Sequence, residues 1–100
     1  MNDKQFDDAF TAAGGWFILI QFEIIADWKG EKSKLVDDLF KEGFDNKRTG
    51  TNTRVSSIIR LIDNNRGKEA LEKIRDSAII NKTHPEAKKL AEDIIRRRYR

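Results

Sequence analysis

The chain has 100 residues, which is enough for one domain with one core, and 37% of them are charged. It contains no cysteine, so disulfides, thiolate metal sites and thiol catalysis are excluded and an intracellular, cytoplasmic setting is favoured. No apolar stretch approaches the ~20 residues of a membrane span, and we expect no membrane contact. The high charged fraction predicts amphipathic elements with solvated outer faces.

The charges are unevenly divided along the chain, whose net charge is +3. Residues 1–45 carry five lysines and ten acidic residues, whereas residues 46–100 carry fifteen Lys or Arg and seven acidic residues. Such a division indicates either a partner that recognises one sign of charge, or attraction between the two halves within one fold.

The first two expected elements are separated by Gly14 and Gly15. A helix is predicted over residues 3–13, where apolar residues recur at helical spacing. Residues 16–28 fit either a helix that is apolar nearly all round or an alternating strand. We predict the helix, because a lone strand would leave its backbone groups unpaired.

Four further helices are expected. Three cover about 31–42, 52–64 and 67–79, separated by polar or glycine-containing segments. The last opens with Thr83-His84-Pro85-Glu86, a pattern typical of a capping box. Residues 1–100 therefore predict an all-α, compact single-domain bundle of about five or six short helices. The alternative is an α fold with one β segment at 16–25.

A basic stretch before the fourth expected helix is a candidate anion site. It leads into a threonine-rich helix start, where unpaired backbone N–H groups and the positive end of the helix dipole favour a phosphate. The alternative is that Thr51, Asn52 or Thr53 only caps the helix. The candidate nucleic-acid-binding residues here are Lys47, Arg48, Thr51, Thr53, Arg54 and Arg60.

A second basic segment ends the chain, where Arg96, Arg97 and Arg98 precede Tyr99. These arginines can contact phosphates while the tyrosine stacks on a base. The alternative is that they only complement the negative end of the last helix dipole.

The aromatic segment around residues 16–28 is a candidate partner interface. Trp and Phe side chains dominate the energetics of many protein interfaces, and homodimerisation is one form this contact can take. The candidate residues are Trp16, Phe17, Phe22 and Trp28.

The sequence contains few residues in patterns that are typical of a catalytic site. The single histidine, His84, lies beside a proline in an expected first turn, and no serine has a nucleophile motif around it. Glu23, Asp27 and Glu31 recur every four residues, but a solvated acidic face explains them better than a metal site. We expect no enzyme activity, no cofactor, no metal and no small-molecule substrate.

The leading functional hypothesis is therefore a small helical binding module that contacts nucleic-acid phosphates through its basic half. The alternative is a protein-interaction module, such as a regulator, inhibitor or adaptor, that uses its aromatic or acidic N-terminal half. Convergence of the basic residues on one exposed face would favour nucleic acid. Their pairing with carboxylates would indicate that the charge division serves the fold.

Overall fold

The computed structural model describes residues 1–99, and every regular element in that range is a helix. This confirms the all-α prediction, although the helices number seven rather than five or six. They are α1 (Asp3–Ala13), α2 (Gly15–Ala26), α3 (Lys32–Phe40), α4 (Arg48–Asp63), α5 (Gly67–Arg75), α6 (Ala78–Thr83) and α7 (Ala87–Arg98).

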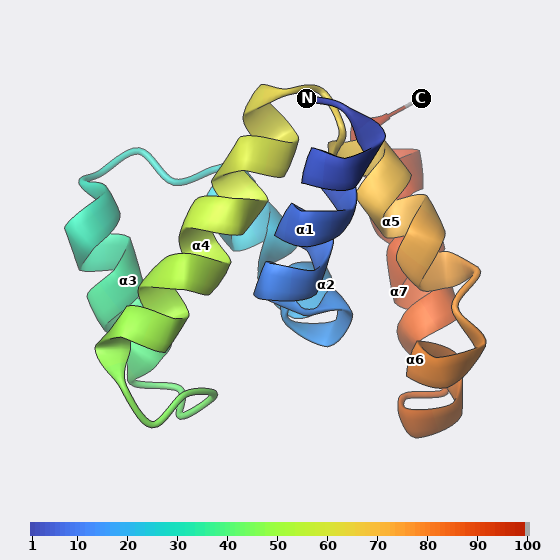
Figure 1. The fold of residues 1–100 in the computed structure, drawn as a ribbon. Coiled ribbons are helices and arrows are strands. Elements are labelled where there is room, and N and C mark those ends of the chain that lie inside the picture. Colours follow the sequence, from blue (N-terminus) through green and yellow to red (C-terminus); the bar gives the residue numbers. More distant parts are fainter. Residues whose placement is uncertain (100) are drawn as a thin grey trace.

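The segment for which helix and strand were both considered forms α2. This helix lies at the centre of the molecule, in contact with α1, α4, α5 and α7 (Figure 1). A helix surrounded on several sides can bury apolar residues on all of its faces, which explains the nearly continuous apolar run. The buried α2 residues are Phe17, Ile18, Leu19, Gln21, Phe22 and Ile25.

A sharp corner at Gly14 separates α1 from α2. The two helices are bent by 91° relative to one another, and Gly14 has a φ of +82°. A Cβ atom at this position would lie 2.7 Å from Nη1 of Arg54. Both the left-handed backbone and the close approach of Arg54 therefore favour glycine here.

The remaining helices flank this central pair (Figure 1). α3 and α4 lie on one side, and α5, α6 and α7 lie on the other. α1 packs against α4, and α5 packs against α7. The core between them is continuous and takes its largest fully buried apolar side chains from four helices, α2, α3, α4 and α5: Ile18, Phe22, Leu35, Val36, Val55, Ile58, Leu61, Leu71 and Ile74.

The predicted helix over 67–79 is divided in two. α5 ends at Arg75, and after a break at Asp76 and Ser77 the short α6 begins. The Ser77 side chain accepts a hydrogen bond from the backbone N–H of Ile80 at 3.2 Å and so caps α6. A serine that bonds the backbone in this way competes with helix continuation, which accounts for the break.

The capping box predicted at residues 83–86 is wrong. Thr83 is the last residue of α6, and its hydroxyl donates to the carbonyl of Ile79. Asn81 supplies a cap instead, because its Oδ1 accepts from the backbone N–H of Lys88 at 2.8 Å. The Asn81 amide also donates to the carbonyls of Ile74, Arg75 and Ser77, so one side chain joins α5, α6 and α7.

No single helix within residues 1–99 has the length and apolar character needed to cross a membrane. α1 and α2 reach that length only in combination, across their 91° corner.

Candidate functional site

The anion site predicted before α4 holds a carboxylate of the protein itself. α4 begins at Arg48, four residues earlier than predicted, so Thr51 and Thr53 lie within the helix and do not cap it. The buried Thr51 hydroxyl donates to Asp45 at 3.0 Å, and Nε of Arg54 donates to the same carboxylate at 3.1 and 3.2 Å. Two of the predicted phosphate donors therefore hold Asp45.

Arg54 has further contacts that fix it in place. Its Nη1 donates to the carbonyl of Ala13, at the end of α1, at 2.7 Å. The guanidinium also lies 5.5 Å from the ring centre of Phe17, within the range of a cation–π contact. Arg54 therefore connects α4 to the loop before it, to α1 and to α2.

The other predicted basic residues near α4 differ in their surroundings. Arg48 donates to Asp37 at 2.5 Å and to the backbone and hydroxyl oxygens of Ser33 at 3.1 Å. The hydrogen bond from Arg48 lowers the pKa of Asp37 below its usual value. Lys47 and Arg60 are exposed and have no carboxylate partner within residues 1–99. These two remain open to an external anion.

The C-terminal arginines pair with acidic side chains. Arg97 Nη2 donates to Glu23 at 2.5 Å, and Arg98 Nη2 donates to Asp27 at 2.7 Å. Arg96 pairs with Asp93 on its own helix. The hydrogen bond from Arg98 lowers the pKa of Asp27. The tail that was predicted to contact phosphates thus holds the end of α7 on α2.

The same pattern extends over the molecule. Ion pairs between the acidic N-terminal half and the basic C-terminal half are Asp3–Arg66, Asp7–Lys73, Glu23–Arg97, Glu23–Arg98, Asp27–Arg98, Asp37–Arg48 and Asp45–Arg54. Figure 1 shows the start of α4 and the end of α7 at opposite ends of the molecule, so the two predicted basic segments do not converge. Much of the charge division therefore serves contacts within the fold.

The aromatic residues predicted as a partner interface are split between core and surface. Phe17 and Phe22 are 2% and 1% exposed, and neither is accessible to a partner in this fold. Trp16 is half-buried and stacks on His84, with ring centres 3.7 Å apart. Tyr99, considered for base stacking, packs edge-on against Phe22. Trp28 is the remaining half-buried aromatic residue of the set.

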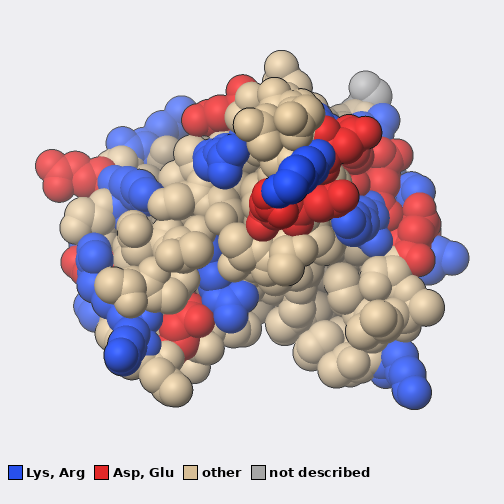
Figure 2. All heavy atoms as spheres, viewed as in Figure 1, with Lys and Arg blue, Asp and Glu red and all other residues tan. Residues whose placement is uncertain are grey.

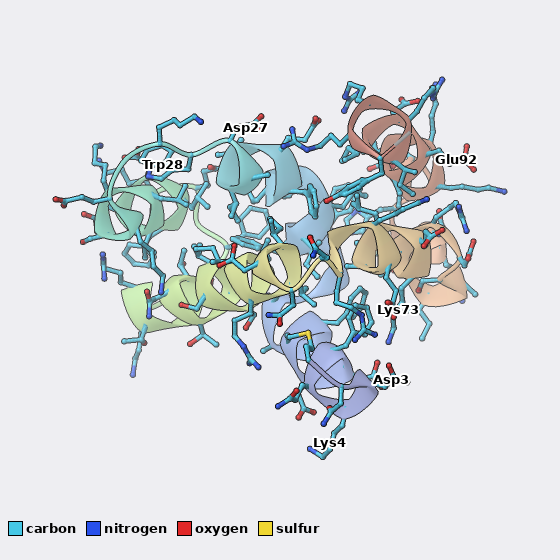
Figure 3. The ribbon with its side chains drawn as sticks, turned by 90° about the horizontal axis from the view of Figure 1, so that it is seen from above. Asp3, Lys4, Asp27, Trp28, Lys73 and Glu92 are labelled. Carbon is cyan, nitrogen blue, oxygen red and sulfur yellow. The ribbon has the colours of Figure 1, made fainter. Side chains whose placement is uncertain are left out.

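Trp28 borders an apolar hollow on the surface between α2, α3 and α4. This feature, the α2–α3–α4 cleft, has a volume of about 270 Å³. The Trp28 Nε1 donates to the carbonyl of Glu31 at 3.0 Å, which fixes the indole beside α3, where Figure 3 shows it. The cleft is lined by Ile25, Ala26, Trp28, Gly30, Lys32, Leu35, Ile59, Ile62 and Asp63.

Only two charged residues line this cleft, Lys32 and Asp63. The Lys32 ammonium donates to the hydroxyl of Ser56 on α4 but meets no carboxylate within residues 1–99. The Asp63 carboxylate has no hydrogen bond or ion pair in that range. Sequence reasoning missed this site because Ile59 and Ile62 fit the inward face of an amphipathic helix, and their partial exposure depends on how closely α3 approaches.

A second hollow is shallow and acidic. It lies between α1 and α5, where Figure 2 shows acidic side chains gathered, and it has a volume of about 430 Å³. Arg66 and Lys73 lie within it and already pair with Asp3, Asp7 and Glu69. No group of three or more metal-ligating side chains with suitable geometry occurs in the described part of the chain.

Comparisons of the chain with protein-family models, curated proteins and solved structures find no match.

Proposed function

We propose that this chain is a protein-interaction module that receives an apolar side chain of a partner protein in the α2–α3–α4 cleft. The observation that carries this proposal is the character of the cleft lining, which is predominantly apolar on a surface otherwise rich in paired charges. Burying one large aliphatic or aromatic side chain there would contribute about 1.5–3 kcal/mol. A fixed indole at the rim suits such an anchor.

The cleft suits a side chain better than a nucleic-acid base. A base has polar edges, and burying them without hydrogen-bond partners is energetically unfavourable. The lining offers one ammonium and one carboxylate, and the Trp28 N–H is already used. An apolar side chain has no such requirement.

Selection from a peptide library tests this proposal. Helix-forming peptides are selected for binding to the intact chain, and binding is followed through Trp28 in a Trp16→Phe variant, which leaves Trp28 as the only tryptophan. We expect peptides that change the Trp28 emission and bind Ile62→Glu about tenfold more weakly or worse. Ile79→Glu, at a highly exposed position on α6, is the matched control.

Because Ile62 is partly buried, the fold of the Ile62→Glu variant is checked by circular dichroism. Ile59→Ala is a second, milder variant of the same wall. The proposal is overturned when no peptide changes the Trp28 emission, or when the selected peptides bind both cleft variants as well as the parent chain.

Contact with nucleic-acid phosphates is the second candidate function. The observation in its favour is a group of exposed cations from the α3–α4 side of the molecule that have no carboxylate partner within residues 1–99: Lys29, Lys32, Lys41, Lys47 and Arg60. It ranks second because most of the predicted arginines already hold carboxylates of the chain.

A further inference from the structure

We infer that the occupant of the α2–α3–α4 cleft is an amphipathic helix of a partner protein, with an acidic residue facing Lys32 and a basic residue facing Asp63. This inference rests on the proposed function and specifies the partner's chemistry.

The charges of the cleft set the first requirement. Lys32 and Asp63 are exposed charges in the lining, and neither meets an opposite charge within the described residues. Most of the described Lys and Arg side chains do have such a partner, as Arg54 has in Asp45. An occupant with both signs of charge, correctly placed, would supply the two missing partners and keep other partners out.

The spacing along α4 sets the second requirement. Lys32 reaches Ser56, and Asp63 lies seven residues further along the same helix. At 1.5 Å per residue this separation is about 10 Å, or two helical turns. A helix docked along α4 with an acidic and a basic residue seven positions apart matches this distance and places an apolar residue between them. That apolar residue faces Ile59 and Ile62.

The other charges near the cleft do not alter this assignment. Lys29 and Glu31 flank the lining residue Gly30 in the chain and have opposite signs. Arg60 lies on α4 between the lining residues Ile59 and Ile62, and it forms no ion pair with Asp63. The charge contrast along the cleft is therefore the one between Lys32 and Asp63.

A helical occupant also follows from the architecture. All regular elements of residues 1–99 are helices, so that part of the chain offers no sheet edge to which an extended peptide can add. Recognition of a proline-rich segment requires an aromatic-lined groove, and Trp28 is the single aromatic residue of this lining. Insertion of an amphipathic helix into an apolar groove is the mode that remains.

Charge exchange tests the inference with the tightest peptide from the selection described above. We expect that peptide to carry an acidic and a basic residue about two turns apart, on either side of its apolar anchor. Lys32→Glu is expected to weaken its binding about tenfold, and changing the peptide's acidic residue to Lys is expected to restore binding to that variant. In the second cycle the chain carries Asp63→Lys, and the basic residue of the peptide is changed to Glu.

Lys82→Glu and Glu92→Lys are the matched controls. Both positions are exposed, and they lie on α6 and α7, away from the cleft lining. The inference is overturned when Lys32→Glu weakens peptide binding no more than Lys82→Glu does. It is also overturned when the charge-exchanged peptide does not restore binding to the Lys32→Glu variant. In that case binding that still depends on Ile62 and changes the Trp28 emission leaves the proposed function standing. If binding neither depends on Ile62 nor changes the Trp28 emission, both the inference and the proposed function are overturned.

Discussion

Arg54 joins parts of the chain that are distant in sequence. It donates to the carboxylate of Asp45, nine residues earlier in the chain, and to the carbonyl of Ala13 at the end of α1. Its side chain is 30% exposed and that of Asp45 is 14% exposed, so water shields this pair less than the outer ion pairs. Removal of the guanidinium would leave both Asp45 and the Ala13 carbonyl without this donor.

We therefore expect Arg54→Ala to lower the free energy of unfolding by about 2–3 kcal/mol, since hydrogen bonds to charged groups are among the stronger ones. Urea denaturation of the parent and variant chains measures the difference. Arg60→Ala, which removes an exposed arginine with no ion pair within residues 1–99, should change stability by less than about 0.5 kcal/mol. Equal effects of the two substitutions would contradict this role for Arg54.

At the scale of single residues, the sequence indicated the right chemistry around Arg54 but not its ligand. Thr51 and Arg54 were predicted as anion donors, and both do donate to an anionic group. That group is Asp45, six residues before Thr51, which only the early start of α4 at Arg48 brings into reach. Helix boundaries are weakly encoded when no strong cap is present, and Lys47 makes no side-chain cap.

Among the elements, α7 depends on charge for its position against α2. Arg97 and Arg98 donate to Glu23 and Asp27, and the hydrogen bond from Arg98 holds the pKa of Asp27 below its ordinary value of 3.8. A carboxyl group whose pKa is lower in the folded than in the unfolded chain stabilises the fold above its unfolded pKa. This contribution is lost as the pH falls through the folded-state pKa.

We expect the free energy of unfolding to fall as the pH is lowered from about 5 to about 2, and to fall less in an Arg97→Ala/Arg98→Ala variant. Urea denaturation across this pH range gives both curves. Some dependence should persist, because Asp37, Glu69 and Asp76 also have lowered pKa values from their arginine partners. Parallel curves for the parent and the double variant would show that this contact does not couple to folding.

Tyr99 reports the docking of the same helix end. Burial raises the pKa of its phenol, which packs against Phe22. Because the chain has one tyrosine, the rise in ultraviolet absorbance that accompanies phenol ionisation reports this group. We expect its titration midpoint to lie above 10.0 in the folded chain and to return towards that value in urea. A midpoint that urea does not change would contradict the burial of Tyr99.

The helices themselves were largely predictable, and the exceptions have local causes. The apolar spacing of residues 3–13 and 52–64 matches α1 and most of α4. The break after α5 depends on Ser77, whose cap is too weak a pattern to recognise in advance. The α2–α3–α4 cleft was not predictable, because it arises from an imperfect fit between three helices rather than from a motif.

For the whole molecule, the balance of paired and unpaired charge bears on the second candidate function. Figure 2 shows basic side chains distributed over the α3–α4 side and acidic ones over α1 and α5. A binding surface for phosphates on the α3–α4 side would use Lys47 and Arg60, which have no carboxylate partner within residues 1–99. The arginines at the end of α7 would contribute little.

If the chain contacts nucleic acid, Lys47→Glu/Arg60→Glu should weaken binding to a labelled duplex more than Lys82→Glu/Lys88→Glu, which removes the same number of exposed cations from α6 and α7. The affinity should also fall steeply between about 50 and about 200 mM salt, because counterions are released on binding. Fluorescence anisotropy measures both effects. Absence of any complex at about 50 mM salt would exclude this function.

The central position of α2 has a consequence for synthesis of the chain. α2 ends at Ala26, but α4, which covers it, is complete only at Asp63, some 37 residues later. At about 5–20 residues per second, the most apolar segment of the protein emerges about 2–7 s before its cover is available. During that interval Phe17, Ile18 and Phe22 have no native partners on α4 or α5. A nascent chain stalled between residues 26 and 63 would therefore be a substrate for chaperones that bind exposed apolar segments.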